Sequence, residues 1–244
     1  MSDAEKSVAG ADFEAPRFIA LDEAWAVVDK PSGIVVHPGW AQDDGGLLRR
    51  VRDALGAQVF PAHRLDRGAS GLVVFARSSE VAATLGRAFA EGEVDKRYLA
   101  LVRGHPPAEV LIDHPIPGRE DGPRVPALTW VRTLGTWDRY ALCEARPRTG
   151  RLHQIRRHLK HLSCPLIGDA NYGKSEHNRR FRTEFGLDRL ALHAFALTLA
   201  HPVSGVRVTL TAPLSGSFAA CLARIGLADA AARALSASAE PAGP

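Results

Sequence analysis

The sequence has little sulfur and no long apolar stretch. Its 3 cysteines, Cys143, Cys164 and Cys221, are far apart and odd in number. This excludes a disulfide framework and a cysteine-pair zinc site, and it suits a reducing cytoplasm. No apolar run approaches the roughly 18 residues that a membrane-spanning helix needs. Residues 1–16 carry early acids and lack the apolar segment of a secretory signal, so we expect a cytoplasmic protein.

Acidic residues are absent from segment 146–161, although the net charge of the whole chain is only +4. A second basic cluster spans 174–182 and is interrupted only by Glu176. Solvated helix faces normally mix both signs of charge, whereas one-signed patches are typical of proteins that bind a polyanion. The candidate phosphate contacts in these two clusters are Arg151, Arg157, Lys160, Arg179 and Arg180.

Histidines are numerous, but they are not spaced as metal ligands. The chain has 10 of them, and the closest group is His153, His158 and His161. The separations within this group do not give the i, i+4 pair of a helical zinc site, and no acidic ligand lies nearby. We therefore expect no metal site.

Short strands dominate the predicted elements. Apolar runs and alternation predict strands over 25–28, 72–76, 96–103, 130–134, 140–145 and 190–199. Helical spacing predicts helices over 80–91, 153–162 and 217–225, with a basic loop before the last long strand. Strands outnumber helices and hairpin-length loops join them, which predicts an α+β fold with a mixed, mainly antiparallel sheet. We expect one domain over 17–228, between mobile tails at 1–16 and 229–244. The alanines at 229–235 are also compatible with a longer last helix.

One carboxylate stands out as a candidate catalytic group. Residues 63–71 read His-Arg-Leu-Asp-Arg-Gly-Ala-Ser-Gly and run directly into the apolar segment 72–76. Asp66 thus lies between the guanidinium groups of Arg64 and Arg67, in a loop of small residues that leads into a strand. The alternative is an aspartate that only stabilises its own turn. Two further segments, 96–104 and 149–158, favour the catalytic interpretation.

These three segments, in this order, resemble motifs of the RluA-type family of RNA pseudouridine synthases. The Lys-Pro-Ser-Gly run at 30–33 and the Pro-Leu-Ile-Gly-Asp run at 165–169 fit the same family, and the resemblance extends over about residues 17–213. One departure is Ala69, where the family usually has a threonine, so a hydroxyl is missing near the site. The resemblance implies a sheet in two halves with flanking helices and an active cleft between the halves.

The resemblance also implies the reaction and the roles of the site residues. The reaction isomerises a specific uridine to pseudouridine and needs no cofactor, metal or energy source. Asp66 matches the family nucleophile, and attack on the sugar, addition to the ring and a glycal route all stay open. Arg156 matches the arginine that pairs with this aspartate, the alternative being a phosphate contact. Tyr98 matches the tyrosine against the target base, the alternative being a buried structural tyrosine. Arg64 matches the residue that fills the space left by the extruded base.

Within the family, the chain most resembles the bacterial TruC-type subfamily, which modifies uridine 65 of tRNA. Residues 37–40 and the tract 178–194 carry this resemblance, and the insertion between Gly173 and His193 separates the chain from ribosomal members. We expect a monomer that binds RNA, with tRNA as the substrate and Lys30 and Arg67 as backbone or phosphate contacts. The alternatives are a 23S rRNA pseudouridine synthase, a non-catalytic RNA-binding module, and a glycoside hydrolase that uses Asp66 with Glu144.

Overall fold

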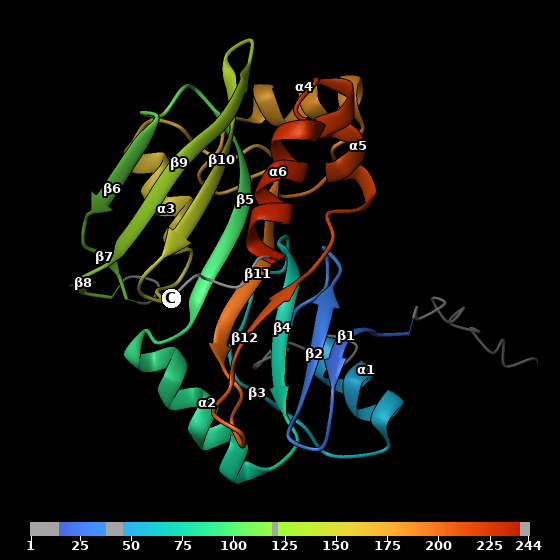
Figure 1. Ribbon diagram of the computed structural model, residues 1–244. Coiled ribbons are helices and arrows are strands. Elements are labelled where there is room, and N and C mark those ends of the chain that lie inside the picture. Colours follow the sequence, from blue (N-terminus) through green and yellow to red (C-terminus); the bar gives the residue numbers. More distant parts are fainter. Residues whose placement is uncertain (1–14, 38–45, 119–121, 240–244) are drawn as a thin grey trace, which may run out of the picture.

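A computed structural model describes residues 15–37, 46–118 and 122–239 (Figure 1). Most of the predicted N-terminal tail and residues 38–40 of the subfamily motif lie outside these ranges. Every helix within them is too short or too polar to cross a lipid bilayer.

Ten strands of the described chain form one mixed sheet, and two short strands form a separate pair. The strands are β1 (Arg17–Leu21), β2 (Trp25–Lys30), β3 (Phe60–Pro61), β4 (Ser70–Ala76), β5 (Asp95–Arg103), β6 (Glu109–Asp113), β7 (Ile116–Pro117), β8 (Arg124–Val125), β9 (Leu128–Trp137), β10 (Tyr140–Pro147), β11 (Leu192–Ala200) and β12 (Arg207–Thr211). The path through the large sheet is β1-β2-β4-β11-β5-β10-β9-β6, with β3 added to β4 and β12 to β11. Only the β4–β11 pair is parallel, which confirms the predicted mixed, mainly antiparallel sheet.

Six helices of the described chain pack around this sheet. They are α1 (Gly46–Leu55), α2 (Ser79–Glu91), α3 (Gln154–His161), α4 (Ser175–Phe185), α5 (Gly216–Arg224) and α6 (Ala228–Ala239). In Figure 1, α3 lies behind β9 and β10, α4 to α6 gather at the top of the molecule, and α2 lies at the bottom. Strand β5 and helix α3, which carry two of the three predicted motifs, therefore lie with the half of the sheet on the left of this view, whereas the loop with Asp66 leads into β4 in the other half.

Side-chain alternation along β5 sorts residues between two cores. Tyr98, Ala100 and Val102 belong to a core cluster with part of α3, whereas Leu99 and Leu101 pack in a second cluster with α4, α5 and α6. Neighbouring residues of a strand point to opposite faces of its sheet. The central strand thus supplies side chains to both faces.

The two halves of the sheet meet at a narrow parallel seam between β4 and β11. Only two residue pairs form it, Ser70 with His193 and Gly71 with Ala194. Gly71 has φ +110, and a Cβ there would collide with the backbone of Ala194. Glycine is therefore required at this position for the two strands to approach.

Two segments differ from the sequence-based prediction. The basic loop expected over 174–182 is mostly helix α4, which is anchored by the fully buried ring of Phe181. The mobile tail expected from residue 229 is instead helix α6, whose Ala230, Ala231 and Ala234 are buried in the second core cluster. Alanine has the highest helix propensity, and its small side chain lets a helix pack closely against an apolar surface. The turn at Gly226 makes α6 a separate helix, not an extension of α5.

Candidate active site

The three predicted catalytic residues line one cavity. Asp66, Tyr98 and Arg156 come from the loop before β4, from β5 and from α3, and they face a hollow of about 560 Å³. This volume is within the usual range for a small-molecule or nucleotide site. Asp66 and Arg156 are 90 residues apart in the chain, so the fold brings together groups that the sequence separates.

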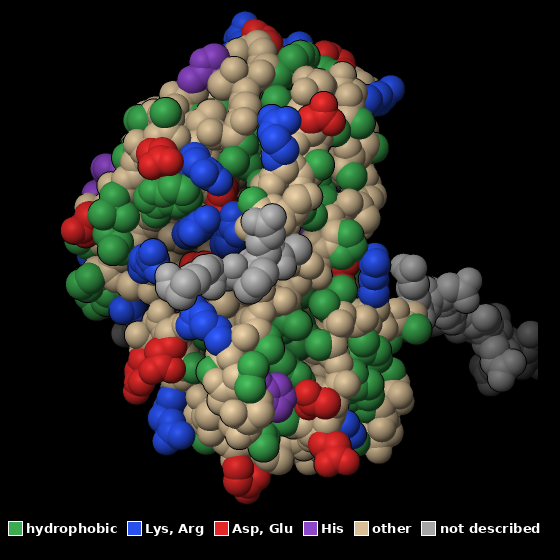
Figure 2. Space-filling view, in the orientation of Figure 1, with side chains coloured by type: hydrophobic (Ala, Val, Ile, Leu, Met, Phe, Trp, Pro, Cys, Tyr) green, Lys and Arg blue, Asp and Glu red, His purple; other side chains and the backbone are tan. Residues whose placement is uncertain are grey.

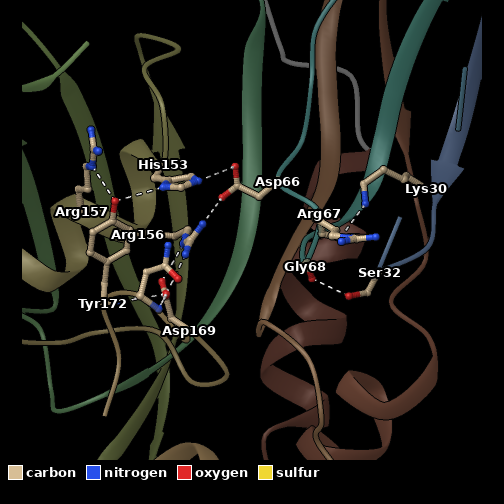
Figure 3. A network of polar contacts seen from close by, with 11 residues as sticks. Lys30, Ser32, Asp66, Arg67, Gly68, His153, Arg156, Arg157, Asp169 and Tyr172 are labelled. Atoms are coloured by element: carbon tan, nitrogen blue, oxygen red, sulfur yellow. Dashed lines mark hydrogen bonds and ion pairs between the residues drawn. The ribbon is translucent and has the colours of Figure 1, made fainter. Parts of the chain in front are cut away.

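The loop that carries Asp66 is held from behind by the Lys-Pro-Ser-Gly motif (Figure 3). Ser32 Oγ donates to the carbonyl of Gly68 at 2.6 Å, and the backbone N–H of Gly33 donates to the carbonyl of Arg67 at 2.8 Å. Lys30 Nζ, fully buried, donates to the carbonyls of Pro31, Ile34 and Arg67. Burial and the charge of Arg189 lower the pKa of Lys30 to about 7. Lys30 is thus a backbone contact that shapes the loop, and its ammonium group is not available to a phosphate.

His63 secures the start of the same loop. Its Nε2 accepts the backbone N–H of Val74 at 3.1 Å, and its ring stacks on Phe89 with the centroids 4.4 Å apart. Burial and the nearby charge of Lys96 lower the pKa of His63 to about 3. A neutral histidine with an occupied Nε2 organises the loop and does not act as a catalytic acid.

Arg156 contacts Asp66 at the wall of the cavity and has a fixed orientation. Its Nη1 donates to Asp66 Oδ2 at 3.1 Å, while Nε and Nη2 form a two-pronged contact with the carboxylate of Asp169, each at 2.8 Å. Such paired contacts fix the plane of a guanidinium group. The geometry therefore matches the predicted pairing with the aspartate, and it leaves little of Arg156 for a phosphate.

Asp169, in the Pro-Leu-Ile-Gly-Asp run at 165–169, is a site residue that the sequence alone does not predict, because only the fold brings it to Arg156. Its side chain is completely buried and also accepts the backbone N–H groups of Asn171 and Tyr172. Burial alone would raise the pKa of Asp169, but the bonds from Arg156 and the two N–H groups outweigh it and lower the pKa. Asp169 is thus a permanent anion that holds Arg156 in place.

A second group of side chains approaches Asp66 from α3 and the following loop. His153 Nε2 lies 3.9 Å from Asp66 Oδ1, and its Nδ1 is 3.1 Å from the hydroxyl of Tyr172. The same hydroxyl accepts from Arg157 Nε at 2.9 Å. His153 has φ +54, in the left-handed region, so backbone strain is stored beside the site. Burial lowers the pKa of His153, with Asp66 opposing the shift, which favours the neutral ring.

Tyr98 presents its ring and hydroxyl to the cavity. The residue is 8% exposed, and its hydroxyl makes no hydrogen bond with any part of the chain that the structure describes. Burial and the charge of Asp66 raise the pKa of Tyr98, so the hydroxyl stays protonated. A buried tyrosine whose polar end faces a cavity is suited to contact a ligand.

The predicted RNA contacts differ in exposure, and two of the exposed ones also donate to backbone carbonyls: Arg67 Nε to Gly33 at 3.0 Å and Arg151 Nε to Pro126 at 3.3 Å. The exposed residues are Arg64 and Arg151 at the cavity, and Arg67, Lys160 and Arg179. Arg157 is half-buried and bound to Tyr172 and to the carbonyl of Pro117. Arg180 binds Glu184 and Asp138, and its guanidinium lies over the Trp137 ring, so its donors are largely occupied.

Glu144, the partner carboxylate of the hydrolase alternative, lies on the opposite face of the sheet. It pairs in register with Leu99, whereas Ala145 pairs with Tyr98, so it points away from the cavity. Its carboxylate is fully buried and accepts from Arg97, Arg132 and Arg146 at 2.6, 2.9 and 2.7 Å. Glu144 therefore cannot flank a substrate together with Asp66, which makes the glycoside hydrolase alternative, built on these two residues, wrong.

No group of three or more histidine, cysteine, aspartate or glutamate side chains suited to a metal ion occurs in the described ranges. His158, one of the three histidines considered, hydrogen-bonds to Thr129 Oγ1 at 2.8 Å and to the carbonyl of His114 at 3.0 Å. His161 stacks on the His114 ring with the centroids 3.8 Å apart.

Comparison with known proteins agrees with the geometry. The sequence model of the RNA pseudouridylate synthase family matches residues 24–161. A protein of Vibrio parahaemolyticus called tRNA pseudouridine synthase C is 36% identical over 220 residues, covering 81% of this chain and 89% of the relative. The protein of that name from Salmonella typhimurium is 37% identical over 232 residues, covering 85% and 89%.

Solved structures give the same result. Human RNA pseudouridylate synthase domain containing 1 has a TM-score of 0.72 and 26% identity, with 96% of this chain and 99% of that chain covered. The human domain containing 4 protein has a TM-score of 0.70 and 26% identity, with 86% and 93% covered. The predicted family and fold are confirmed: this chain belongs to the RNA pseudouridylate synthase family.

Proposed function

We propose that this protein converts one uridine of tRNA to pseudouridine, with Asp66 as the nucleophile. The observation that carries the proposal is the Asp66 carboxylate, which is open to the cavity on one side and held by Arg156 on the other. The relatives called tRNA pseudouridine synthase C support tRNA as the substrate. The tract 178–194 supports position 65 through its resemblance to the TruC-type subfamily.

The reaction rearranges bonds within one nucleotide. The bond from ribose C1′ to N1 of uracil breaks, the base turns, and C1′ bonds to C5, whose proton is then lost while N1 gains one. Atoms and electrons balance without an added reactant, so the site needs a carboxylate, a place to hold the base and a route for one proton. Sugar attack, ring addition and the glycal route all start from an ionised Asp66.

Arg156 prepares Asp66 for this role. The guanidinium contacts Oδ2 only, and the Asp66 side chain remains 24% exposed, so the carboxylate is oriented and accessible. Asp169 fixes Arg156 from the side away from Asp66. The pair of Asp66 and Arg156 is therefore oriented before RNA binds.

Tyr98 provides the surface against which the base turns. Its ring stacks on uracil. No described residue hydrogen-bonds to its hydroxyl, so the hydroxyl is available to the edge of the base. The raised pKa of Tyr98 argues against a phenolate base. We assign the hydroxyl to a relay that accepts a proton as it donates its own.

Cationic side chains at the cavity and at some distance from it serve the RNA. Arg64 fills the space that the extruded uridine leaves, because unstacking a base costs a few kcal/mol and needs a substitute contact. Arg67, Arg151, Arg157 and Lys160 contact phosphates near the cavity, and Arg179 and Arg180 belong to a more distant cluster. We further propose a cytoplasmic monomer that acts without cofactor or metal.

The test is pseudouridine mapping by carbodiimide modification of total RNA from a strain that lacks the gene. We expect the signal at uridine 65 of tRNA to disappear and to return with the wild-type gene, but not with Asp66→Ala. Loss of a 23S rRNA signal, with tRNA unchanged, would select the ribosomal alternative. No change in any RNA would support the non-catalytic binding module.

A further inference from the structure

Helix α4 is docked firmly onto the body of the protein, although the residues over 174–182 are mostly polar. The ring of Phe181 is fully buried, and His177 Nδ1 lies 2.8 Å from the hydroxyl of Tyr140 on β10. Gly186, with φ +68, ends the helix in a left-handed cap. The helix is therefore a fixed element, and a side chain on its inner face has a fixed position.

Asn178 is such a side chain, and it clasps the loop that carries Asp169. Its Oδ1 accepts the backbone N–H of Gly168 at 2.8 Å, and its Nδ2 donates to the backbone carbonyl of Asp169 at 2.9 Å. Both polar ends of one amide thus bind the two residues at the turn of this loop. A primary amide is the side chain that supplies a donor and an acceptor at this spacing.

The loop is also fixed on its other side. Gly168 has φ +75, and a Cβ there would collide with the backbone carbonyl of Arg189. The Gly168–Asp169 peptide therefore lies between the segment before β11 and the amide of Asn178. From this peptide the Asp169 side chain reaches Arg156, which in turn contacts Asp66.

We propose that Asn178 is a positioning residue for pseudouridine formation, acting through the Gly168–Asp169 peptide to set the orientation of Arg156 against Asp66. The inference rests on the proposed function of Asp66. It also gives the insertion after Gly173 a role inside the protein, in addition to the proposed RNA contacts on its outer face. Small displacements of a catalytic group carry large rate penalties, about 10²-fold for 1 Å.

The test compares Asn178→Ala with Thr183→Ala in single-turnover reactions at saturating tRNA. Thr183 is exposed on the same helix and donates only to helix carbonyls, so it is a matched control. We expect Asn178→Ala to slow the reaction at least about tenfold, with tRNA affinity within twofold of wild type and the control unchanged. An unchanged rate, or weaker binding with a normal rate at saturation, would overturn the proposal.

A double-mutant cycle separates positioning from general destabilisation. If Asn178 acts through Asp169, adding Asn178→Ala to Asp169→Asn lowers the rate less than twofold further, whereas multiplying effects would contradict the proposal. Should the alanine variant fail to fold, Asn178→Asp keeps the size and the acceptor but loses the donor, and the same tenfold loss is expected. Failure of wild-type protein to modify tRNA would refute the proposed function itself, which distinguishes the two outcomes.

Discussion

Two clusters of carboxylates and arginines lie on opposite faces of the sheet, and adjacent residues of β5 lead into them. Tyr98 faces the cavity with Asp66 and Arg156, whereas Arg97 faces Glu144. Figure 2 shows the face of the sheet opposite to α3, and Lys and Arg side chains gather in the middle of it, over β5, β9 and β10. Around Glu144, three arginines surround a carboxylate with no exposed surface; at the cavity, one arginine contacts a carboxylate that stays 24% exposed.

The difference shows how one pair of residue types supports structure or chemistry. Both carboxylate oxygens of Glu144 accept from arginines and are fully buried, so Glu144 links β5, β9 and β10 and is not accessible to a ligand. Asp66 accepts one hydrogen bond, from Arg156, and a third residue, Asp169, holds Arg156 in place with two more. The exposed, partly hydrogen-bonded carboxylate of Asp66 is thus available for chemistry, whereas the enclosed carboxylate of Glu144 is not.

The largest effect is expected from Asp66→Ala. Loss of the nucleophile should reduce pseudouridine formation at least about 10³-fold, while the free energy of unfolding changes by about 1 kcal/mol or less. Single-turnover assays on tRNA and denaturant titration measure the two quantities. A variant that keeps a tenth of the wild-type rate would remove Asp66 from the chemistry.

Glu144→Gln should give the reverse pattern. The change leaves three arginines around a neutral amide, which is expected to cost about 3–5 kcal/mol of stability. The rate per folded molecule should stay near that of wild type, because this face does not line the cavity. Urea unfolding with an active-site titration tests this, and a strong rate loss without destabilisation would link the two faces.

Tyr98 tests whether the hydroxyl takes part in the chemistry. Tyr98→Phe should bind tRNA normally but react about 10²-fold more slowly, whereas Tyr98→Leu should also lose about 1–3 kcal/mol of binding from stacking. Measurements of Kd and of single-turnover rate separate the two effects. Near-normal rates for Tyr98→Phe, together with a lower Tm for both variants, would make Tyr98 a structural residue.

Acid should destabilise the wild-type protein through its buried carboxylates. The pKa of Glu144 is lowered because the bonds from Arg97 and Arg146 outweigh burial, and the pKa of Asp169 is lowered by Arg156 in the same way. Their stabilisation is complete above the unfolded-state value near 4 and is lost as pH falls through the lower folded-state values. We expect stability to fall as the pH drops below about 4, and to fall less in Glu144→Gln.

The smallest effect separates two neighbouring arginines of α4. Arg179 is exposed, whereas Arg180 binds Glu184 and Asp138. Arg179→Ala should lower the slope of log K against log salt for tRNA binding by about one. Arg180→Ala should lower Tm and leave this slope nearly unchanged. Equal slopes for wild type and Arg179→Ala would show that this face of α4 does not contact RNA.

The sequence predicted what local patterns determine. Alternation predicted the strand that the structure shows as β5, and the loop motif placed Asp66 before a buried strand. Contacts between residues far apart in the chain could not be predicted from these patterns. Lys30 donates to a carbonyl 37 residues away, and Asn178 clasps a loop that belongs to a different motif. Helix α4 was missed because it has few apolar residues, and a cluster of Trp137, Tyr140 and Phe181 rings stabilises it.

The position of β11 also affects how the protein is made. Of the described strands, only β12 follows β11 in the chain. Strand β11 is therefore synthesised late, yet it lies between β4 and β5 at the centre of the sheet. A nascent chain that ends at residue 185 therefore exposes the strand edges that β11 will cover, and such edges pair readily with other chains. Protection by chaperones is needed most during synthesis of this interval, and chains truncated before β11 should aggregate.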